Sequence, residues 1–338
     1  MTELTSQLLT VAAVVEETAD ARSIVFDADF PYAPGQFLTL RVPSVQCGSV
    51  ARCYSLSSSP HEGGKPQVTV KRTADGYASN WLCDNVSAGS TIEVLPPSGI
   101  FTPKSLEADL LLFAGGSGIT PVMSILKSAL AAGSGRIVLV YANRDESSVI
   151  FAGELRTLAL KHPERLTVIH WLESVQGLPT VGQLRTLARP FADYDAFTCG
   201  PAPFMKAVTE ALKTLGFPRE RRHLERFASL GANPFDQAVT AAPDPDGEKA
   251  VVELELDGRR HTVDWPVTSK LLDVLLDKGL PAPYSCREGA CSACAYRLVS
   301  GEVKLLNNEV LDQEDLDEGI RLACQSVPVT SKVEISYE

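Results

Sequence analysis

The stretch "PYSCREGACSACAYRL", from Pro283 to Leu298, places Cys286, Cys291 and Cys294 within nine residues. The residues between these cysteines are mostly Gly, Ala and Ser. Clustered cysteines are used for disulfides, for zinc binding, for redox catalysis and for iron–sulfur clusters. The rest of the sequence has to decide which of these chemistries applies.

The size and composition are those of an ordinary globular protein with more than one domain. The chain has 338 residues, 44% of them hydrophobic and 22% charged, and a net charge of −11. This length predicts two or three domains, and the negative charge argues against a nucleic-acid partner. No stretch approaches the roughly 20 apolar residues of a membrane span, and the N-terminus lacks the features of a secretory signal. We therefore expect a cytoplasmic protein with reduced cysteines and no membrane partner.

The pattern of apolar residues predicts three structural regions. Residues 1–105 hold short strands separated by Pro/Gly turns, which is typical of an antiparallel barrel or sandwich. Residues 106–230 alternate strands with helices, which predicts a parallel sheet covered on both faces. Residues 231–248 lack periodicity and are expected to be a linker. Residues 249–338 begin with a predicted hairpin and a short helix that precede the cysteine loop.

The spacing of the cysteines favours an iron–sulfur cluster. Cys286, Cys291 and Cys294 follow the C-x4-C-x2-C pattern, and Cys324 comes after 29 further residues. This is the plant-type [2Fe–2S] arrangement, with a distant fourth ligand. A zinc site would more naturally contain two C-x2-C pairs, of which only one is present, so zinc stays the weaker alternative.

Residues 249–338 resemble plant-type ferredoxins, and this resemblance implies a β-grasp [2Fe–2S] domain with the four cysteines as metal ligands. An acidic run lies between the third and fourth cysteines and contains no Lys or Arg. We consider two uses for it, a solvated helix face and a docking patch for a basic partner. The acidic residues are Glu309, Asp312, Glu314, Asp315, Asp317 and Glu318.

The stretch "ARCYSLSSSP" resembles the R-x-Y-[ST] signature of the ferredoxin–NADP reductase family. The resemblance implies that Arg52 neutralises a flavin pyrophosphate, that Tyr54 lies against the isoalloxazine ring, and that Ser55 forms a hydrogen bond near its N5 atom. Because alternate residues of a strand face the same side, Arg52 and Tyr54 can reach one ligand.

Two further segments resemble the same flavin domain. Gly76 and Ser79 stand at the start of a predicted helix, whose N–H groups can hold a phosphate. The preceding strand "QVTVKRT" supplies Val70 and Lys71 as cofactor-binding candidates. A phosphate site at Gly76 and Ser79 suits a dinucleotide, so the resemblance implies FAD in an antiparallel β-barrel.

The stretch "FAGGSGITPVMS" follows a predicted buried strand and opens a helix, which is the context of a phosphate-binding loop. Gly115, Gly116 and Gly118 allow the backbone to approach a pyrophosphate. We expect Thr120 to cap the helix and Pro121 to occupy its first turn. The loop departs from the Rossmann pattern but matches the G-G-x-G-[IVL]-[TA]-P loop of the reductase family.

The same resemblance assigns two later segments. Cys199, Gly200 and Pro201 form a C-G-P segment that would place the thiol beside the nicotinamide ring. Glu225 and Phe227, in "HLERF", resemble the segment near the flavin ring at the end of the nucleotide domain.

The nicotinamide cofactor is predicted as NADH or NADPH, with a preference for NADH. Arg144 follows the second predicted strand, where a cation could bind the 2′-phosphate of NADPH. The adjacent Asp145 and Glu146 would repel that phosphate.

The order of flavin, nucleotide and cluster regions resembles the reductase components of multicomponent oxygenases. The reductases of 3-ketosteroid 9α-hydroxylases are the most similar group, and those of phenylacetyl-CoA epoxidases are also similar. The resemblance implies electron transfer from NAD(P)H through FAD and a [2Fe–2S] cluster to a terminal, Rieske-type oxygenase, with Tyr54, Ser55 and Cys199 at the site of hydride transfer. Two alternatives stay open: a reductase for a di-iron monooxygenase, and a non-enzymatic ferredoxin-type carrier or redox sensor.

Overall fold

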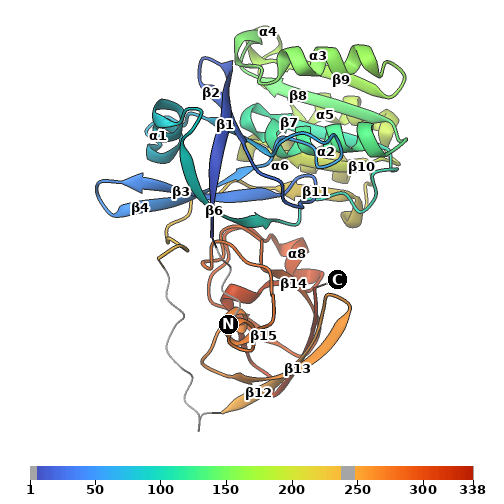
Figure 1. Ribbon diagram of the computed structural model, residues 1–338. Helices are drawn as coiled ribbons and strands as arrows, with labels where there is room; N and C mark the ends of the chain where they lie inside the picture. The colour runs from blue at the N-terminus through green and yellow to red at the C-terminus, as the bar shows by residue number, and fades with distance from the viewer. Residues whose placement is uncertain (1–5, 237–247, 338) are drawn as a thin grey trace.

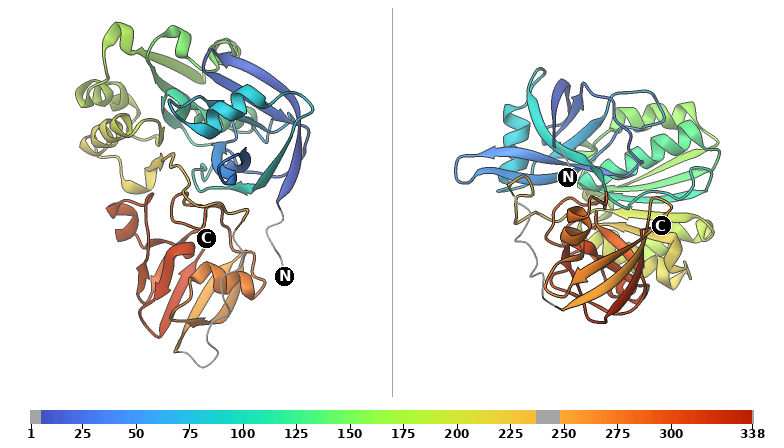
Figure 2. Two further views of the ribbon diagram at one scale, coloured as in Figure 1. Left: turned by 90° about the vertical axis from the view of Figure 1, so that its left-hand side faces the viewer. Right: turned by 60° about the horizontal axis from the view of Figure 1, so that its bottom comes forward.

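The structure is a computed structural model that describes residues 6–236 and 248–337. It contains three sheet-based regions, and Figure 1 shows the two N-terminal ones side by side with the C-terminal one beneath them. The views in Figure 2 show the same arrangement from two other directions. Most of the expected linker, 231–248, falls on residues 237–247, which lie outside the described residues.

The first region is the expected antiparallel barrel. Its elements are β1 (Gln7–Thr18), β2 (Ala21–Phe26), β3 (Phe37–Ser44), β4 (Gly48–Ser55), β5 (Gln67–Lys71), α1 (Tyr77–Asn85) and β6 (Thr91–Ser98). The strands form one six-stranded sheet in the order β4-β3-β6-β1-β2-β5. A bridge between Leu56 and Val68 joins its two edges, so the sheet curls round the apolar core.

The second region is the expected parallel sheet. Its elements are β7 (Leu110–Gly115), α2 (Ile119–Ala132), β8 (Ile137–Asn143), α3 (Ala152–Lys161), β9 (Leu166–Leu172), α4 (Glu173–Gln176), α5 (Val181–Ala188), β10 (Asp195–Cys199), α6 (Ala202–Thr214) and β11 (Arg222–Glu225). The strand order is β11-β10-β7-β8-β9, and all pairs are parallel.

The strands of this sheet are buried on both faces, which explains their continuous apolar sequences. In β7, Leu110 and Leu112 pack with α2 and α3, whereas Leu111 and Phe113 pack with α5 and α6. The expected cap of α2 is wrong: Gly118 precedes the helix, and Thr120 Oγ1 donates to the carbonyl of Ser117 at 3.1 Å. A Gly116–Gly118 3₁₀ turn leads into the helix, which begins at Ile119, two residues earlier than a Thr120 cap would allow.

The third region is a β-grasp-like mixed sheet around α7. Its elements are β12 (Lys249–Leu256), β13 (Arg259–Pro266), α7 (Leu271–Asp277), β14 (Ala295–Ser300), β15 (Val303–Leu305), α8 (Gln313–Asp317), β16 (Ile320–Leu322), β17 (Ser326–Pro328) and β18 (Lys332–Ser336). The main sheet has the order β13-β12-β18-β14-β16, with β12 and β18 parallel. Asp257 and Gly258 both adopt positive φ, as the predicted tight hairpin turn requires.

The buried side chains of the C-terminal sheet and of α7 surround Trp265, which is fully buried. Cys294 and Cys324 belong to this core, so the sheet holds one side of the cysteine loop in place. Within the described part of the chain, no helix has the length and apolarity needed to cross a membrane.

Candidate cofactor and electron-transfer site

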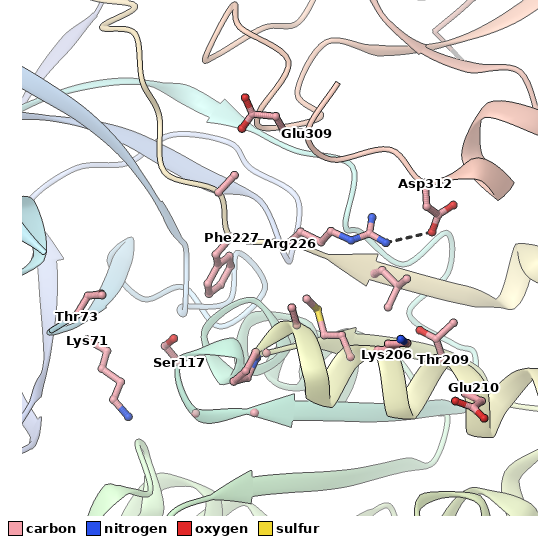
Figure 3. Close-up of a pocket in the computed structure, with 18 of the residues that line it drawn as sticks. Lys71, Thr73, Ser117, Lys206, Thr209, Glu210, Arg226, Phe227, Glu309 and Asp312 are labelled. Atoms are coloured by element: carbon pink, nitrogen blue, oxygen red, sulfur yellow. Dashed lines mark hydrogen bonds and ion pairs between the residues drawn. The ribbon is translucent and has the colours of Figure 1, made fainter. Parts of the chain in front are cut away.

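All three regions contribute to one cavity of about 1180 Å³. It lies at the carboxyl ends of β7 and β10, where parallel sheets usually bind ligands. Figure 3 shows Lys71 and Thr73 of the barrel on one side, α6 on another, and Glu309 and Asp312 of the C-terminal region above them. The candidate residues that line this cavity are Lys71, Gly115, Gly116, Gly200, Pro201 and Phe227.

The glycine loop and the C-G-P segment are packed directly on each other. A Cβ atom at Gly118 would lie 2.2 Å from the carbonyl oxygen of Cys199, and one at Gly115 would lie 2.8 Å from Cδ of Pro201. Gly116 has φ of +52°, and the space beside it is open toward Lys71. The structure therefore brings these two predicted segments together and leaves a backbone cradle at the N-terminus of α2, where an anion is favoured.

A second cavity, of about 450 Å³, adjoins the first at the ends of β8 and β9. Apolar side chains such as Trp171 and Phe204 line it together with Arg144 and Glu173. Asn143 also lines it and is buried, yet neither polar atom of its amide has a hydrogen-bond partner among the described residues. A buried amide of this kind can pair with a ligand or with water. Arg144 is mostly exposed and lies 3.5 Å from Asp20.

Strand β4 carries the predicted flavin residues. Ser55 is buried, and burial raises the pKa of Tyr54, so its phenol is neutral. The guanidinium of Arg52 donates to the carbonyls of Ala51 at 2.7 Å and Leu230 at 2.9 Å. In the described structure Arg52 thus links the barrel to the segment that follows β11.

The predicted turn at Gly76 lies at the start of α1. Gly76 precedes the helix without a side-chain cap, which leaves the first-turn N–H groups available for a ligand. Ser79 is buried, and its hydroxyl accepts from the N–H of Thr73 at 3.1 Å. Val70 is buried in the barrel core, whereas Lys71 extends into the large cavity.

Glu225 and Phe227 lie where the flavin residues approach the cysteine loop. A small space of about 30 Å³ is lined by Ser55, Glu225, Phe227 and Cys291, among others. Burial raises the pKa of Glu225 to about 8, although the nearby Arg226 opposes this shift. A carboxyl group that is largely protonated at neutral pH can donate a hydrogen bond there.

Cys199 ends β10 beneath the glycine loop and is almost fully buried. Burial raises the pKa of its thiol well above the ordinary value, and the carboxyl of Glu225 adds to this effect. Cys199 is therefore a neutral thiol at neutral pH. It is not a nucleophile, because nucleophilic cysteines have a lowered pKa.

The four predicted ligand cysteines are buried and free of disulfides. The backbone N–H of Cys286 donates to Sγ of Cys291 at 3.4 Å, and the N–H of Cys324 donates to Sγ of Cys294 at 3.5 Å. The thiol of Cys286 also neighbours that of Cys324. The four thiols therefore lie together, with Cys286 beside Cys291 and Cys324 beside Cys294, and four cysteines are the ligand number of a [2Fe–2S] cluster.

Backbone N–H groups of the cysteine loop also donate to the sulfur atom of Cys286. The N–H groups of Glu288 and Ala290 donate to Sγ of Cys286 at 3.5 and 3.3 Å. In residues 6–236 and 248–337, no three or more His, Cys, Asp or Glu side chains are grouped to hold a single metal ion. The paired sulfur atoms and their N–H donors fit a [2Fe–2S] cluster.

The cysteine loop packs against the barrel next to the flavin residues. Ser285 and Thr39 share a hydrogen bond of 2.5 Å, and both residues are buried. Cys53, between Arg52 and Tyr54, is close enough to the charge of Cys286 to affect its own pKa, which burial raises to about 12. The cluster ligands are therefore adjacent to the strand that carries the predicted flavin residues.

Comparisons with known proteins match a family to each of the three regions. Residues 9–102 match the oxidoreductase FAD-binding domain family, and residues 112–210 match the oxidoreductase NAD-binding domain family. Residues 254–329 match the 2Fe-2S iron-sulfur cluster binding domain family. Among solved structures, phthalate dioxygenase reductase has a similar fold, with a TM-score of 0.59, 24% identity and 98% coverage of both chains.

Two curated relatives span nearly the whole chain. The ferredoxin reductase component of 3-ketosteroid-9-alpha-monooxygenase from Rhodococcus rhodochrous is 59% identical, over 98% of this chain and 97% of that protein. A component of the 1,2-phenylacetyl-CoA epoxidase from Escherichia coli is 33% identical, over 98% of this chain and 97% of that protein. The chain belongs to the family of oxygenase reductase components. It is an NAD(P)H-dependent oxidoreductase that uses FAD and a [2Fe–2S] cluster to pass electrons to a terminal oxygenase.

Several residues of the assembled site were not predicted from the sequence. Thr39 and Ser285 form the contact between the barrel and the cysteine loop, and Cys53 lies beside them. Asn143 lines the second cavity. Cys53 is the variable position of the R-x-Y-[ST] signature, and the others are ordinary polar residues without a motif, so only the folded chain identifies them.

Proposed function

We propose that this chain is the NADH-dependent reductase of a Rieske-type oxygenase that acts on steroid-like substrates. The observation that carries the proposal is the 59% identity, over nearly the full length, to a 3-ketosteroid monooxygenase reductase component. The positions of Ser55, Glu225 and Cys291 around one small space support direct transfer between flavin and cluster. Eight free cysteines support a reducing, cytoplasmic setting.

The protein's own residues bind and orient the cofactors. The Gly115–Gly118 loop and the start of α2 would hold the nicotinamide pyrophosphate, with Thr120 and Pro121 shaping the first turn. Cys199, Gly200 and Pro201 would position the nicotinamide ring, and the neutral thiol of Cys199 leaves the hydride path free of added charge. When bound, the flavin supplies the change from two-electron to one-electron chemistry.

The barrel residues have complementary roles in this proposal. Tyr54 would cover the flavin ring and exclude water, while Ser55 and Glu225 would offer hydrogen bonds near the ring. Lys71 and the N-terminus of α1 at Gly76 and Ser79 would balance the charge of the pyrophosphate. Arg52 would exchange its bond with Leu230 for one with a phosphate, and Val70 and Phe227 would pack beside the cofactor.

The four cysteines would hold the cluster, and NADH preference would depend on the second cavity. Arg144 and Lys71 are cations that line this cavity and could meet a 2′-phosphate, but Glu173 lines the same space and would repel that phosphate. The proposed regions are 1–105 for the flavin, 106–230 for the nucleotide and 249–338 for the cluster.

An anaerobic titration tests this function. NADH and NADPH are added in parallel to the holoprotein, and absorbance and electron paramagnetic resonance are recorded. We expect NADH to bleach the flavin at lower concentration than NADPH and to produce a reduced [2Fe–2S] signal. If neither nucleotide bleaches the flavin, the protein is a carrier or sensor and the reductase proposal is wrong.

The terminal partner is tested separately. The reduced protein is mixed with a purified Rieske oxygenase and, in parallel, with a di-iron oxygenase. We expect reoxidation of the cluster to be faster with the Rieske oxygenase. Faster reoxidation by the di-iron protein would instead assign the chain to the group of the epoxidase component, to which it is 33% identical.

A further inference from the structure

The acidic run of the C-terminal region faces the nucleotide region of the same chain. Glu314 forms ion pairs with three cations, Lys213, Arg219 and Arg222, and its distance to Arg222 Nη2 is 3.1 Å. Asp315 pairs with Arg219. These partners come from the end of α6 and the segment that leads into β11, about a hundred residues earlier in the chain.

A further pair lies beside the large cavity. Arg226 Nη2 is 3.1 Å from Oδ2 of Asp312, and its Nη1 donates to the carbonyl of Val310 at 2.5 Å. Figure 3 shows this pair above α6, next to Phe227. We call this group of ion pairs the α8 latch. It consists of three carboxylates and four cations: Asp312, Glu314, Asp315, Lys213, Arg219, Arg222 and Arg226.

The latch residues are partly shielded from solvent, which makes their pairing stronger than that of ordinary surface charges. The side chains of Arg222 and Asp315 are only 10% and 14% exposed, whereas those of Glu314 and Lys213 are 36% and 46% exposed. The pKa of Glu314 is lowered by its hydrogen bond with Lys213 and by the charge of Arg222, although burial opposes this. Without the carboxylates, the four cations would face one another and repel.

The latch also binds one end of residues 226–232, the segment that directly follows β11. This segment lies beside the flavin residues and the cysteine loop. Arg226 begins this segment, and Gly231 and Ala232 end it. Their N–H groups donate to the two carboxylate oxygens of Glu288, in the cysteine loop, at 2.9 and 2.7 Å. Between these ends, Leu230 packs with Cys286 and Cys291. The C-terminal region therefore holds this segment at both ends.

We propose that Asp312, Glu314 and Asp315 are positioning residues that hold the cysteine loop beside the flavin site, so that the acidic run serves electron transfer within the chain and is not a docking patch for the oxygenase. This proposal rests on the proposed function. NAD(P)H supplies the electron pair as a hydride, and the latch affects only the one-electron step from flavin to cluster. No further reactant is required.

The test uses Glu314, which lines neither of the two cavities at the ends of the parallel strands. Glu314→Gln keeps the size of the side chain and removes its charge, whereas Glu314→Arg places a fifth cation in the latch. Asp317→Arg is the matched control, because Asp317 lies in the same helix, is exposed, and accepts a hydrogen bond from Gln313 in that helix. Flavin bleaching and cluster reduction are followed separately by stopped flow after addition of saturating NADH.

We expect Glu314→Arg to slow cluster reduction about tenfold or more, since reversing one charge in a shielded network costs more than the free energy of one decade. Glu314→Gln should slow it less and should reduce its dependence on salt, because screening acts on the pairs that this variant lacks. Flavin bleaching should be unchanged in both. Asp317→Arg should match the wild type in every measurement.

Hydrogen exchange gives a readout that does not depend on electron transfer. We expect faster exchange in residues 219–226 and 310–316 of the Glu314 variants, but not of Asp317→Arg. The proposal is overturned if Glu314→Arg reduces its cluster as fast as Asp317→Arg, or if only transfer to the oxygenase is impaired. Loss of flavin bleaching in the wild type would instead contradict the proposed function and would be seen first.

Discussion

The C-terminal region meets the rest of the molecule through two contacts of opposite chemistry. The cysteine loop meets the barrel and the segment after β11 mainly through small and apolar residues, including Phe37, Leu230 and Cys291, beside the hydrogen bond between Thr39 and Ser285. The α8 latch meets the nucleotide region through ion pairs, with Glu314 at their centre. An apolar contact carries no net charge and is therefore expected to depend little on salt. The charged contact orients the domain and weakens as salt is added.

The largest effect is expected from the apolar contact, where the metal ligands lie. Cys291→Ser removes a thiolate from one of the two sulfur pairs, and a hydroxyl is a poor substitute for it. We expect loss of the [2Fe–2S] signal and of cluster-dependent transfer, while NADH still bleaches the flavin. Absorbance and electron paramagnetic resonance measure both. Retention of a full cluster signal would contradict the ligand assignment.

The presence of a [2Fe–2S] region was predictable because its information is local in the sequence. The spacing of Cys286, Cys291 and Cys294 and the glycine loop at Gly115–Gly118 each specify a turn and a chemistry within a few residues. Strand periodicity predicted the barrel and the parallel sheet for the same reason. These features need no knowledge of distant contacts.

The two contacts of the C-terminal region could not be predicted from the sequence. Glu314 meets Lys213 and Arg222 across about 90 to 100 residues, and Glu288 meets Gly231 across 57. Ion pairs of this kind leave no periodic pattern, so the acidic run suggested only a solvated face or an external partner. The structure shows a third use: the acidic run binds a basic surface of the same chain.

The second prediction tests the packing of the apolar contact without touching a metal ligand. Leu230 is 4% exposed and packs against Cys286, Ala290 and Cys291. Leu230→Ala should destabilise this contact by about 2–5 kcal/mol, the usual cost of such a cavity. We expect faster hydrogen exchange in residues 284–294 and slower cluster reduction.

Salt separates the Leu230 effect from that of the latch. In Leu230→Ala, the salt dependence of cluster reduction should stay as in the wild type, because no charge has changed. If cluster reduction in Leu230→Ala no longer depended on salt, the apolar contact and the latch would act as one unit.

A third prediction concerns the buried carboxyl group at the edge of the apolar contact. Burial raises the pKa of Glu225 from 4.5 to about 8. The folded state therefore favours the protonated carboxyl group of Glu225. Its contribution to stability is complete below the unfolded pKa of 4.5 and is lost as the pH rises through about 8. We expect stability to fall with rising pH in this window by at most about 1.4 kcal/mol per unit.

Thermal unfolding at a series of pH values measures this slope. Glu225→Gln removes the titrating group and should flatten the profile, while Asp312 and Glu314 of the latch, whose pKa values are lowered, stay ionised throughout. An equally steep profile in the Gln variant would assign the slope to another group.

The smallest effect is expected from an ion pair that lies within the C-terminal region and joins no two regions. Lys332 Nζ is 2.8 Å from Oε1 of Glu253, and their side chains are 63% and 42% exposed. An exposed pair gains little, because water competes for both charges and salt screens them. Lys332→Ala should therefore leave unfolding temperature, cluster reduction and its salt dependence unchanged within error. If this variant altered the salt dependence as Glu314→Gln does, net charge rather than the position of the latch would control the transfer.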